Sequence, residues 1–65
     1  MAIILIYRNE EHRLEEKKLT VRQAFDRLNL SPETHLAVKE GELITENEVL
    51  KDGDVVNIIA VISGG

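Results

Sequence analysis

The sequence predicts an α+β fold in which one main helix covers one face of a mixed sheet. Three observations lead to this prediction. The chain has 65 residues, which is enough for one small domain. Residues 2–8 and 55–61 are strongly apolar, β-branched runs at opposite ends of the chain. Between them, residues 21–28 carry apolar side chains at helical spacing.

The first strand is predicted to continue into a β-hairpin. The apolar run of residues 2–8 is followed by a polar turn signal at residues 9–11. Residues 12–18 are mostly charged and can return as a solvated strand. Because charge discourages pairing with another chain, we expect this second strand at an edge of the sheet.

The helix has both a start and a stop signal. Thr20 and Gln23 have the spacing of a capping box, in which each side chain accepts the backbone N–H of the other residue. Apolar residues then recur on one helical face, at Val21, Ala24, Phe25 and Leu28. We expect a helix of about nine residues that ends at Asn29.

The second half of the chain is predicted to contain short strands and turns before the last strand. A second capping-box spacing, from Thr45 to Glu48, predicts a single helical turn through Leu50. The other expected elements are a strand at 36–39, a turn at 40–42, a brief strand at 43–44, a turn at 51–54 and the strand at 55–61.

The two end strands decide the arrangement of the sheet. Both are almost apolar on both faces, which is typical of interior strands. We therefore expect residues 2–8 and 55–61 to lie side by side and parallel in a sheet of four to five strands. With one main helix on one face, this is the β-grasp arrangement. The predicted organisation is a β-grasp domain over residues 1–61 and a flexible tail over residues 62–65.

A single helix leaves the other face of the sheet open. Arg8 and Asn57 are the polar members of their strands and mark the side that faces away from the helix. The residues expected in the core are Ile3, Leu5, Val56, Ile58 and Ala60. The residues expected on the open side are Ile4, Ile6, Ile59 and Val61, and contiguous exposed apolar residues of this kind favour a partner-binding face. The alternatives are the opposite parity, or long charged side chains that cover the patch.

Composition excludes several classes of function. The net charge of −4 and the scarcity of aromatic residues argue against direct binding to nucleic acid. The absence of Cys excludes disulfides and Cys-based zinc sites. The apolar run at the start lacks a basic leader, and no run approaches the roughly 18 apolar residues of a membrane span. We therefore expect a cytoplasmic protein without a membrane partner.

The strongest chemical signal is the Gly64-Gly65 pair at the end of the sequence. Only Ile62 and Ser63 separate it from the predicted last strand. Glycine has no Cβ, so a Gly-Gly segment can pass through a narrow channel of a partner's active site. Four extended residues reach about 13 Å beyond the strand. The tail residues expected in such a channel are Ser63 and Gly64.

The chain resembles the ThiS/MoaD group of sulfur carriers, the prokaryotic relatives of ubiquitin. The resemblance covers nearly the whole chain and is most specific from Leu28 onward. The matching stretches are Leu30-Ser31-Pro32-Glu33, Glu40-Gly41-Glu42-Leu43, Asp52-Gly53-Asp54-Val55-Val56 and Ile62-Ser63-Gly64-Gly65. The resemblance implies that the Gly65 carboxylate is adenylated and then carries sulfur as a thiocarboxylate.

The implied partners follow from that chemistry. They are an E1-like adenylating enzyme, a sulfur-donor enzyme and a sulfur-accepting synthase or tRNA-modifying enzyme. The chain itself has no phosphate-binding Gly-rich loop, so ATP and magnesium are expected on the partner and no bound cofactor is expected here. The protein would be a co-substrate rather than an enzyme. The destination of the sulfur stays open between thiamine thiazole, molybdopterin and 2-thiouridine in tRNA.

Other candidate sites are weaker. His12 with Glu10 and Glu11 could bind a metal, but a solvated turn is the favoured interpretation, and no metal site is predicted. Asp52 and Asp54 flank Gly53 and are ordinary turn-forming residues. His35 is expected at the surface without a ligand partner, and no catalytic residue is predicted.

Two other functions remain open. A ubiquitin-like modifier would also be adenylated, but Gly65 would end in an isopeptide bond to a target lysine. In a plain interaction domain, the Gly-Gly pair would be incidental. The three functions differ in what attacks the activated carbonyl of Gly65: a sulfur nucleophile in a carrier, a lysine in a modifier, and nothing in an interaction domain.

Overall fold

A computed structural model describes residues 2–61 of the chain. This part of the chain contains seven strands and one helix. The elements, in chain order, are β1 (Ile3–Tyr7), β2 (Glu10–Leu14), β3 (Lys18–Thr20), α1 (Val21–Arg27), β4 (His35–Lys39), β5 (Glu42–Ile44), β6 (Val49–Lys51) and β7 (Val55–Ala60).

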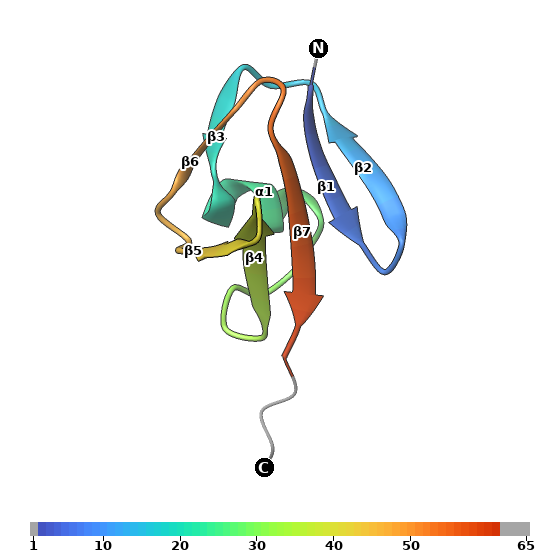
Figure 1. The fold of residues 1–65 in the computed structure, drawn as a ribbon, viewed down its shortest axis with the longest axis vertical. Helices are drawn as coiled ribbons and strands as arrows, with labels where there is room; N and C mark the ends of the chain where they lie inside the picture. The colour runs from blue at the N-terminus through green and yellow to red at the C-terminus, as the bar shows by residue number, and fades with distance from the viewer. Residues whose placement is uncertain (1, 62–65) are drawn as a thin grey trace.

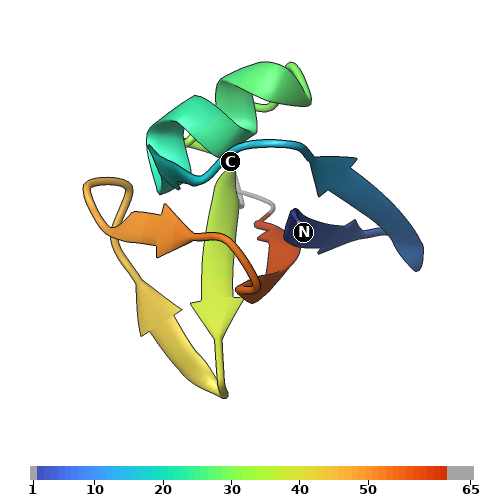
Figure 2. The ribbon, with the colours of Figure 1, turned by 90° about the horizontal axis from the view of Figure 1, so that it is seen from above.

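Five of the strands form one mixed sheet in the order β2-β1-β7-β4-β5 (Figure 1). β1 and β7 are parallel neighbours inside it, whereas β2 pairs with β1 and β4 pairs with β7 in antiparallel fashion. α1 lies on one side of the sheet, as the view along the sheet shows (Figure 2). The predicted β-grasp arrangement is therefore confirmed. β3 and β6 form a second, two-stranded sheet.

The β1–β2 hairpin turns one residue earlier than predicted, at Arg8 and Asn9. Both residues have positive φ angles, 52° and 65°. Two central residues with positive φ are typical of a type I′ turn, whose twist matches the twist of the flanking strands. The turn brings Tyr7 opposite Glu10 and so sets the register of the whole hairpin.

β2 is an edge strand, as predicted, but it is shorter than the predicted strand at residues 12–18. It ends at Leu14, and a separate strand begins at Lys18. Leu19 explains the break, because its side chain is buried in the core. To bury Leu19, the chain leaves its pairing with β1 and crosses to the helix side of the sheet, where β3 pairs with β6.

α1 begins at the predicted capping box. The Oγ1 atom of Thr20 accepts the backbone N–H of Gln23 at 3.1 Å, and the Oε1 atom of Gln23 accepts the backbone N–H of Thr20 at 2.9 Å. These bonds satisfy two donors that the first turn of a helix leaves without a partner.

The helix stops near the predicted residue, after seven residues instead of about nine. Asn29 adopts a left-handed conformation, with φ at 59°. Its N–H donates to the carbonyl of Asp26 at 3.2 Å, and the N–H of Leu30 donates to the carbonyl of Phe25 at 2.9 Å. This is a Schellman motif, in which a left-handed residue closes the last turn.

The predicted helical turn through Leu50 is wrong. Val49–Lys51 is strand β6, which pairs with β3 and places Leu50 opposite Leu19. Leu50 is completely buried while both its neighbours are exposed, and this alternation suits a strand rather than a helical turn. The loop before β6 instead caps α1, because the carbonyls of Glu46 and Glu48 accept the N–H groups of Arg22 and Val21 at 3.0 and 2.9 Å.

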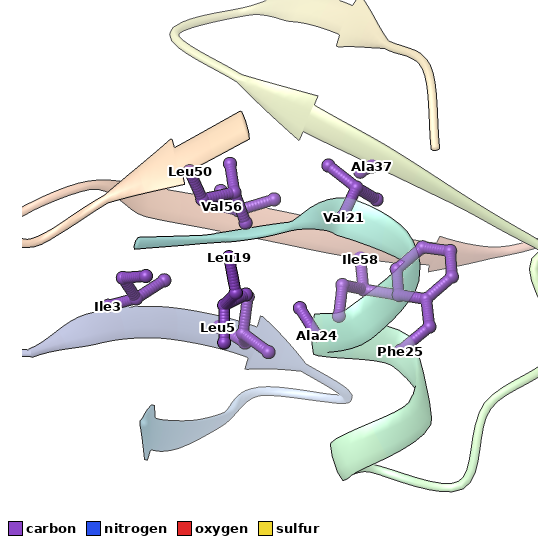
Figure 3. Packing of buried hydrophobic residues seen from close by; sticks show 10 residues of the cluster. All are labelled: Ile3, Leu5, Leu19, Val21, Ala24, Phe25, Ala37, Leu50, Val56 and Ile58. Carbon is purple, nitrogen blue, oxygen red and sulfur yellow. The ribbon is translucent and has the colours of Figure 1, made fainter. Parts of the chain in front are cut away.

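One hydrophobic core lies between α1, the five-stranded sheet and the β3–β6 pair (Figure 3). Its buried members are Ile3, Leu5, Leu19, Val21, Ala24, Phe25, Ala37, Leu50, Val56 and Ile58. Every described element except β2 and β5 contributes at least one of them. The core therefore lies on one side of the sheet, and the opposite side is free to carry a different function.

Candidate docking face and tail attachment

Alternate residues of β1 and β7 lie on opposite sides of the sheet, with the predicted parity. The residues on the helix side are buried: Ile3, Leu5, Val56 and Ile58. Their neighbours on the other side are half-buried or exposed: Ile4, Ile6, Val55, Asn57 and Ile59. The parity prediction is therefore confirmed for both strands, except at the end of β7.

Ala60 is the exception, because it is exposed rather than part of the core. It is the last residue of β7, and its cross-strand neighbour is His35. The core ends one pair earlier, where Ile58 lies opposite Ala37. Alternation alone places Ala60 on the helix side of the sheet, but alternation does not reveal where the covering layer ends.

The cross-strand register adds apolar residues from β4 and β5 to the outer side of the sheet. Leu36 lies opposite Ile59, and Val38 lies between Asn57 and Leu43. We call this surface the open face, made up of Ile4, Ile6, Leu36, Val38, Leu43, Val55, Asn57 and Ile59. Its most exposed apolar residues are Leu43 at 67%, Ile59 at 48%, Val55 at 46% and Leu36 at 39%.

Sequence reasoning missed the β4 and β5 part of the open face. The alternation of Leu36 and Val38 around Ala37 was a usable signal, because small Ala37 is the member that packs against the core. The pairing of β4 with β7, however, joins residues about 20 positions apart in sequence and is not encoded in any local pattern.

Charged side chains border the open face along edge strand β2. Glu11 lies opposite Ile6 and Arg13 lies opposite Ile4, both on edge strand β2. Their aliphatic stems can lie along the neighbouring isoleucines. Leu43 and Ile59 are distant from this border in the strand order and stay exposed, so the charged residues do not cover the face.

β7 leads from the open face directly into the predicted tail. Val61, one residue beyond the strand, donates its N–H to the carbonyl of Thr34 at 2.8 Å. This hydrogen bond continues the β4–β7 pairing and ties the chain to the body of the protein as far as Val61. The predicted site residues Ser63, Gly64 and Gly65, and the expected flexibility of the tail, lie outside the described residues.

His35 is half-buried, not a free surface residue as predicted. Its Nε2 atom is 3.0 Å from the Tyr7 hydroxyl, and its Nδ1 atom is 2.9 Å from the Thr34 hydroxyl and 3.1 Å from the Ser31 carbonyl oxygen. A carbonyl can only accept, which favours the tautomer with the proton on Nδ1 and Tyr7 as donor to Nε2. The ring also contacts Phe25 edge-on, with 6.3 Å between centroids. His35 thus closes the core beside the point where the chain leaves β7.

The weaker candidate sites have structural roles. Asp54 accepts the backbone N–H of Lys51 at 2.8 Å and forms an ion pair with Lys39 at 3.1 Å, so it acts as a turn residue. These two hydrogen bonds, with the one from Lys51 as the larger contribution, lower the pKa of the Asp54 carboxyl. Among residues 2–61, no three His, Asp or Glu side chains lie close enough to hold a metal ion, so His12 has no ligand set with Glu10 and Glu11.

Within the same described range, no helix is long and apolar enough to cross a membrane.

Fold and site together define a class of β-grasp protein. One face of its sheet is apolar and exposed, and its last strand is followed closely by a Gly-Gly pair. Residues 3–65 match the ThiS family, and the chain belongs to that family.

The known proteins that are similar to this chain include one curated relative and one solved structure. The sulfur carrier protein TtuB of Thermus thermophilus is 36% identical over 45 residues, which are 69% of this chain and 69% of that protein. The crystal structure of the thiamine biosynthesis protein ThiS from Geobacter metallireducens superposes with a TM-score of 0.67 at 20% identity. That match covers 95% of this chain and 99% of the other, and it shows that the two share a fold.

Proposed function

We propose that this protein is a sulfur carrier whose Gly65 carboxylate is converted to a thiocarboxylate. The observation that carries the proposal is the continuity of β7, which presents Ile59 on the open face and leads within a few residues to Gly64-Gly65. Membership of the ThiS family supports the same function. The protein acts as a co-substrate, and catalysis belongs to the enzymes that bind it.

The proposed chemistry takes place in two stages. A carboxylate is a poor electrophile, so the Gly65 carboxylate first attacks the α-phosphate of ATP, forming an acyl adenylate and releasing pyrophosphate. Hydrosulfide then attacks the acyl carbon and displaces AMP, which leaves a thiocarboxylate on Gly65. If the donor is an enzyme persulfide, its terminal sulfur forms an acyl disulfide, and a thiol reduces this to the thiocarboxylate.

Each partner in this proposal has a separate role. An E1-like adenylating enzyme holds ATP and magnesium and docks on the open face, including the predicted residues Ile4, Ile6 and Ile59, and on the predicted residue Val61 just beyond β7. A sulfur-donor enzyme supplies the sulfur. A synthase or a tRNA-modifying enzyme accepts it, and transfer from the purified thiocarboxylate to each type of acceptor identifies the recipient. Because the first step consumes ATP, we place the cycle in the cytoplasm.

The test is conversion of the purified protein by an E1-like adenylating enzyme with ATP, magnesium, a persulfide donor and a thiol reductant. Intact-mass spectrometry is expected to show replacement of one oxygen by sulfur, located in the C-terminal peptide. Deleting Gly65, or adding one residue after it, removes the product and leaves the circular dichroism spectrum unchanged. These two variants are matched controls because neither changes a residue of the core cluster, whose members all lie within residues 3–58.

Three outcomes separate the candidate functions. A thiocarboxylate without protein adducts supports the carrier. Adducts through target lysines that resist reductant identify a ubiquitin-like modifier instead. If neither an adenylate nor a thiocarboxylate forms on the intact chain, the carrier proposal is wrong.

A further inference from the structure

Asn57 occupies the centre of the open face. It lies opposite Ile6 on β1 and opposite Val38 on β4. Along β7, Val55 and Ile59 are its neighbours on the same side of the sheet. Asn57 is the one polar residue among the eight that define the open face, and its amide is bordered by apolar side chains in all four directions.

The part of the fold that the structure describes makes no use of this amide. Asn57 is exposed, and its side chain forms no hydrogen bond with any other residue in the described range 2–61. Asparagine is disfavoured in strands, whereas β-branched residues such as its neighbours Val55 and Val56 are favoured. A valine at this position would suit the free protein better than the residue that is present.

The location of β7 decides which partner covers this amide. Four residues, 62–65, follow Val61, and even when fully extended they span only about 13 Å. A protein that holds Gly65 in its active site therefore lies close to the end of β7, on which Asn57 and Ile59 are exposed. The adenylating enzyme of the proposed function is such a protein.

We infer that Asn57 is the polar recognition residue at the centre of the open face, and that it exchanges hydrogen bonds with a polar group of the adenylating enzyme. The inference rests on the proposed function. Docking removes water from the middle of the face, so the amide needs a substitute partner when it is covered. An apolar surface that lacks such a group is rejected, which makes Asn57 a determinant of specificity.

We expect stability and binding to respond in opposite directions when Asn57 is replaced by valine. The Asn57→Val variant is expected to melt about 4 °C higher, because valine has the better strand propensity. Its Kd for a purified E1-like adenylating enzyme that adenylates the wild-type protein is expected to rise about tenfold, because the enzyme's polar group is left without a partner. Isothermal titration calorimetry and thermal unfolding measure the two effects.

Asn47→Ala is the matched control, because Asn47 is an exposed loop residue away from the open face. It is expected to leave the Kd unchanged. If Asn57→Val binds as tightly as the wild type or more tightly, the inference is wrong, and adenylation of the wild type leaves the proposed function intact. A lower melting temperature for Asn57→Val would show that the fold does use the amide, which also contradicts the inference. If no adenylation of the wild type is found, both the proposed function and the inference are wrong.

Discussion

Asp54 shows how one side chain can connect parts of the chain that are distant in sequence. Its carboxylate accepts the N–H of Lys51 within the turn before β7 and pairs with Lys39 at the end of β4. In addition, its backbone carbonyl accepts the N–H of Ile4 at 2.9 Å, next to the start of β1. The turn, β4 and β1 therefore meet at this residue.

The lowered pKa of Asp54 predicts a specific pH dependence of stability. The folded protein favours the ionised carboxyl more than the unfolded chain does, so the stabilisation is complete well above the unfolded pKa of about 3.8. It is lost as pH falls through the folded pKa, where the carboxyl becomes protonated in both states. We expect Asp54→Asn to destabilise the protein near neutral pH, by an amount that shrinks as the pH falls below 3.8.

Urea unfolding of the two proteins across this pH range measures the difference. The asparagine side chain keeps an oxygen that can accept the Lys51 N–H, so the comparison isolates the effect of the charge. A difference between wild type and variant that is independent of pH would contradict the assignment. Asp52→Asn is the control, because Asp52 is an exposed neighbour on the other side of Gly53.

At the scale of the elements, the chain contains two capping-box spacings, and only one starts a helix. Thr20 and Gln23 form both reciprocal hydrogen bonds at the start of α1. Thr45 precedes a turn in which its backbone carbonyl accepts the N–H of Glu48 at 3.1 Å. The second segment becomes a turn and a strand because burying Leu50 against Leu19 stabilises β6, which outweighs a weak local preference for helix.

Substitution of the two threonines is therefore expected to have unequal effects. Thr20→Ala removes a side-chain acceptor that caps α1 and is expected to lower the free energy of unfolding by about 1 kcal/mol. Thr45→Ala keeps the carbonyl that forms its turn, so we expect a change within about 0.5 kcal/mol. Chemical denaturation of both variants measures the two values, and equal losses would mean that Thr45 also acts as a helix cap.

At the scale of the whole molecule, the sheet has two faces with different roles. One face packs against α1 and the β3–β6 pair, and the other exposes Ile59, Leu36 and Leu43. A protein of this size buries only ~60% of the surface of its unfolded chain, so it cannot cover both faces. An apolar face that stays exposed to water is best explained by a partner that covers it.

The two-sided sheet predicts opposite results for adjacent residues of β7. Ile59→Asp is expected to stay folded, because Ile59 is about half exposed, and to weaken docking of the adenylating enzyme by ~1–2 kcal/mol. Ile58→Asp is expected to unfold the protein, because it buries a charge in a domain whose total stability is only of order 5 kcal/mol. Circular dichroism and a binding titration separate the two effects. If Ile59→Asp unfolds instead, the residue belongs to the core and the open face is not a docking surface.

Local patterns in the sequence were sufficient for the elements with a strong period or a cap. The start of α1, the left-handed residue Asn29 that follows it and the two apolar end strands could be predicted because adjacent residues determine them. The composition of the two end strands also identified them as neighbours, since strands that are apolar on both faces belong in the interior of a sheet. The Gly64-Gly65 pair is a feature of the amino-acid sequence itself and can be recognised without a structure.

The remaining features depend on contacts between distant parts of the chain. The strand character of Val49–Lys51 comes from pairing with β3, the exposure of Ala60 from the limit of the core beside His35, and the extent of the open face from the register of β4 on β7. None of these is a local property, because a short segment adopts the conformation that best buries its apolar side chains in the assembled fold. The sequence by itself therefore determined the fold class, the capped helix and the Gly-Gly end, whereas the tertiary structure decided which side chains remain on the surface for a partner to recognise.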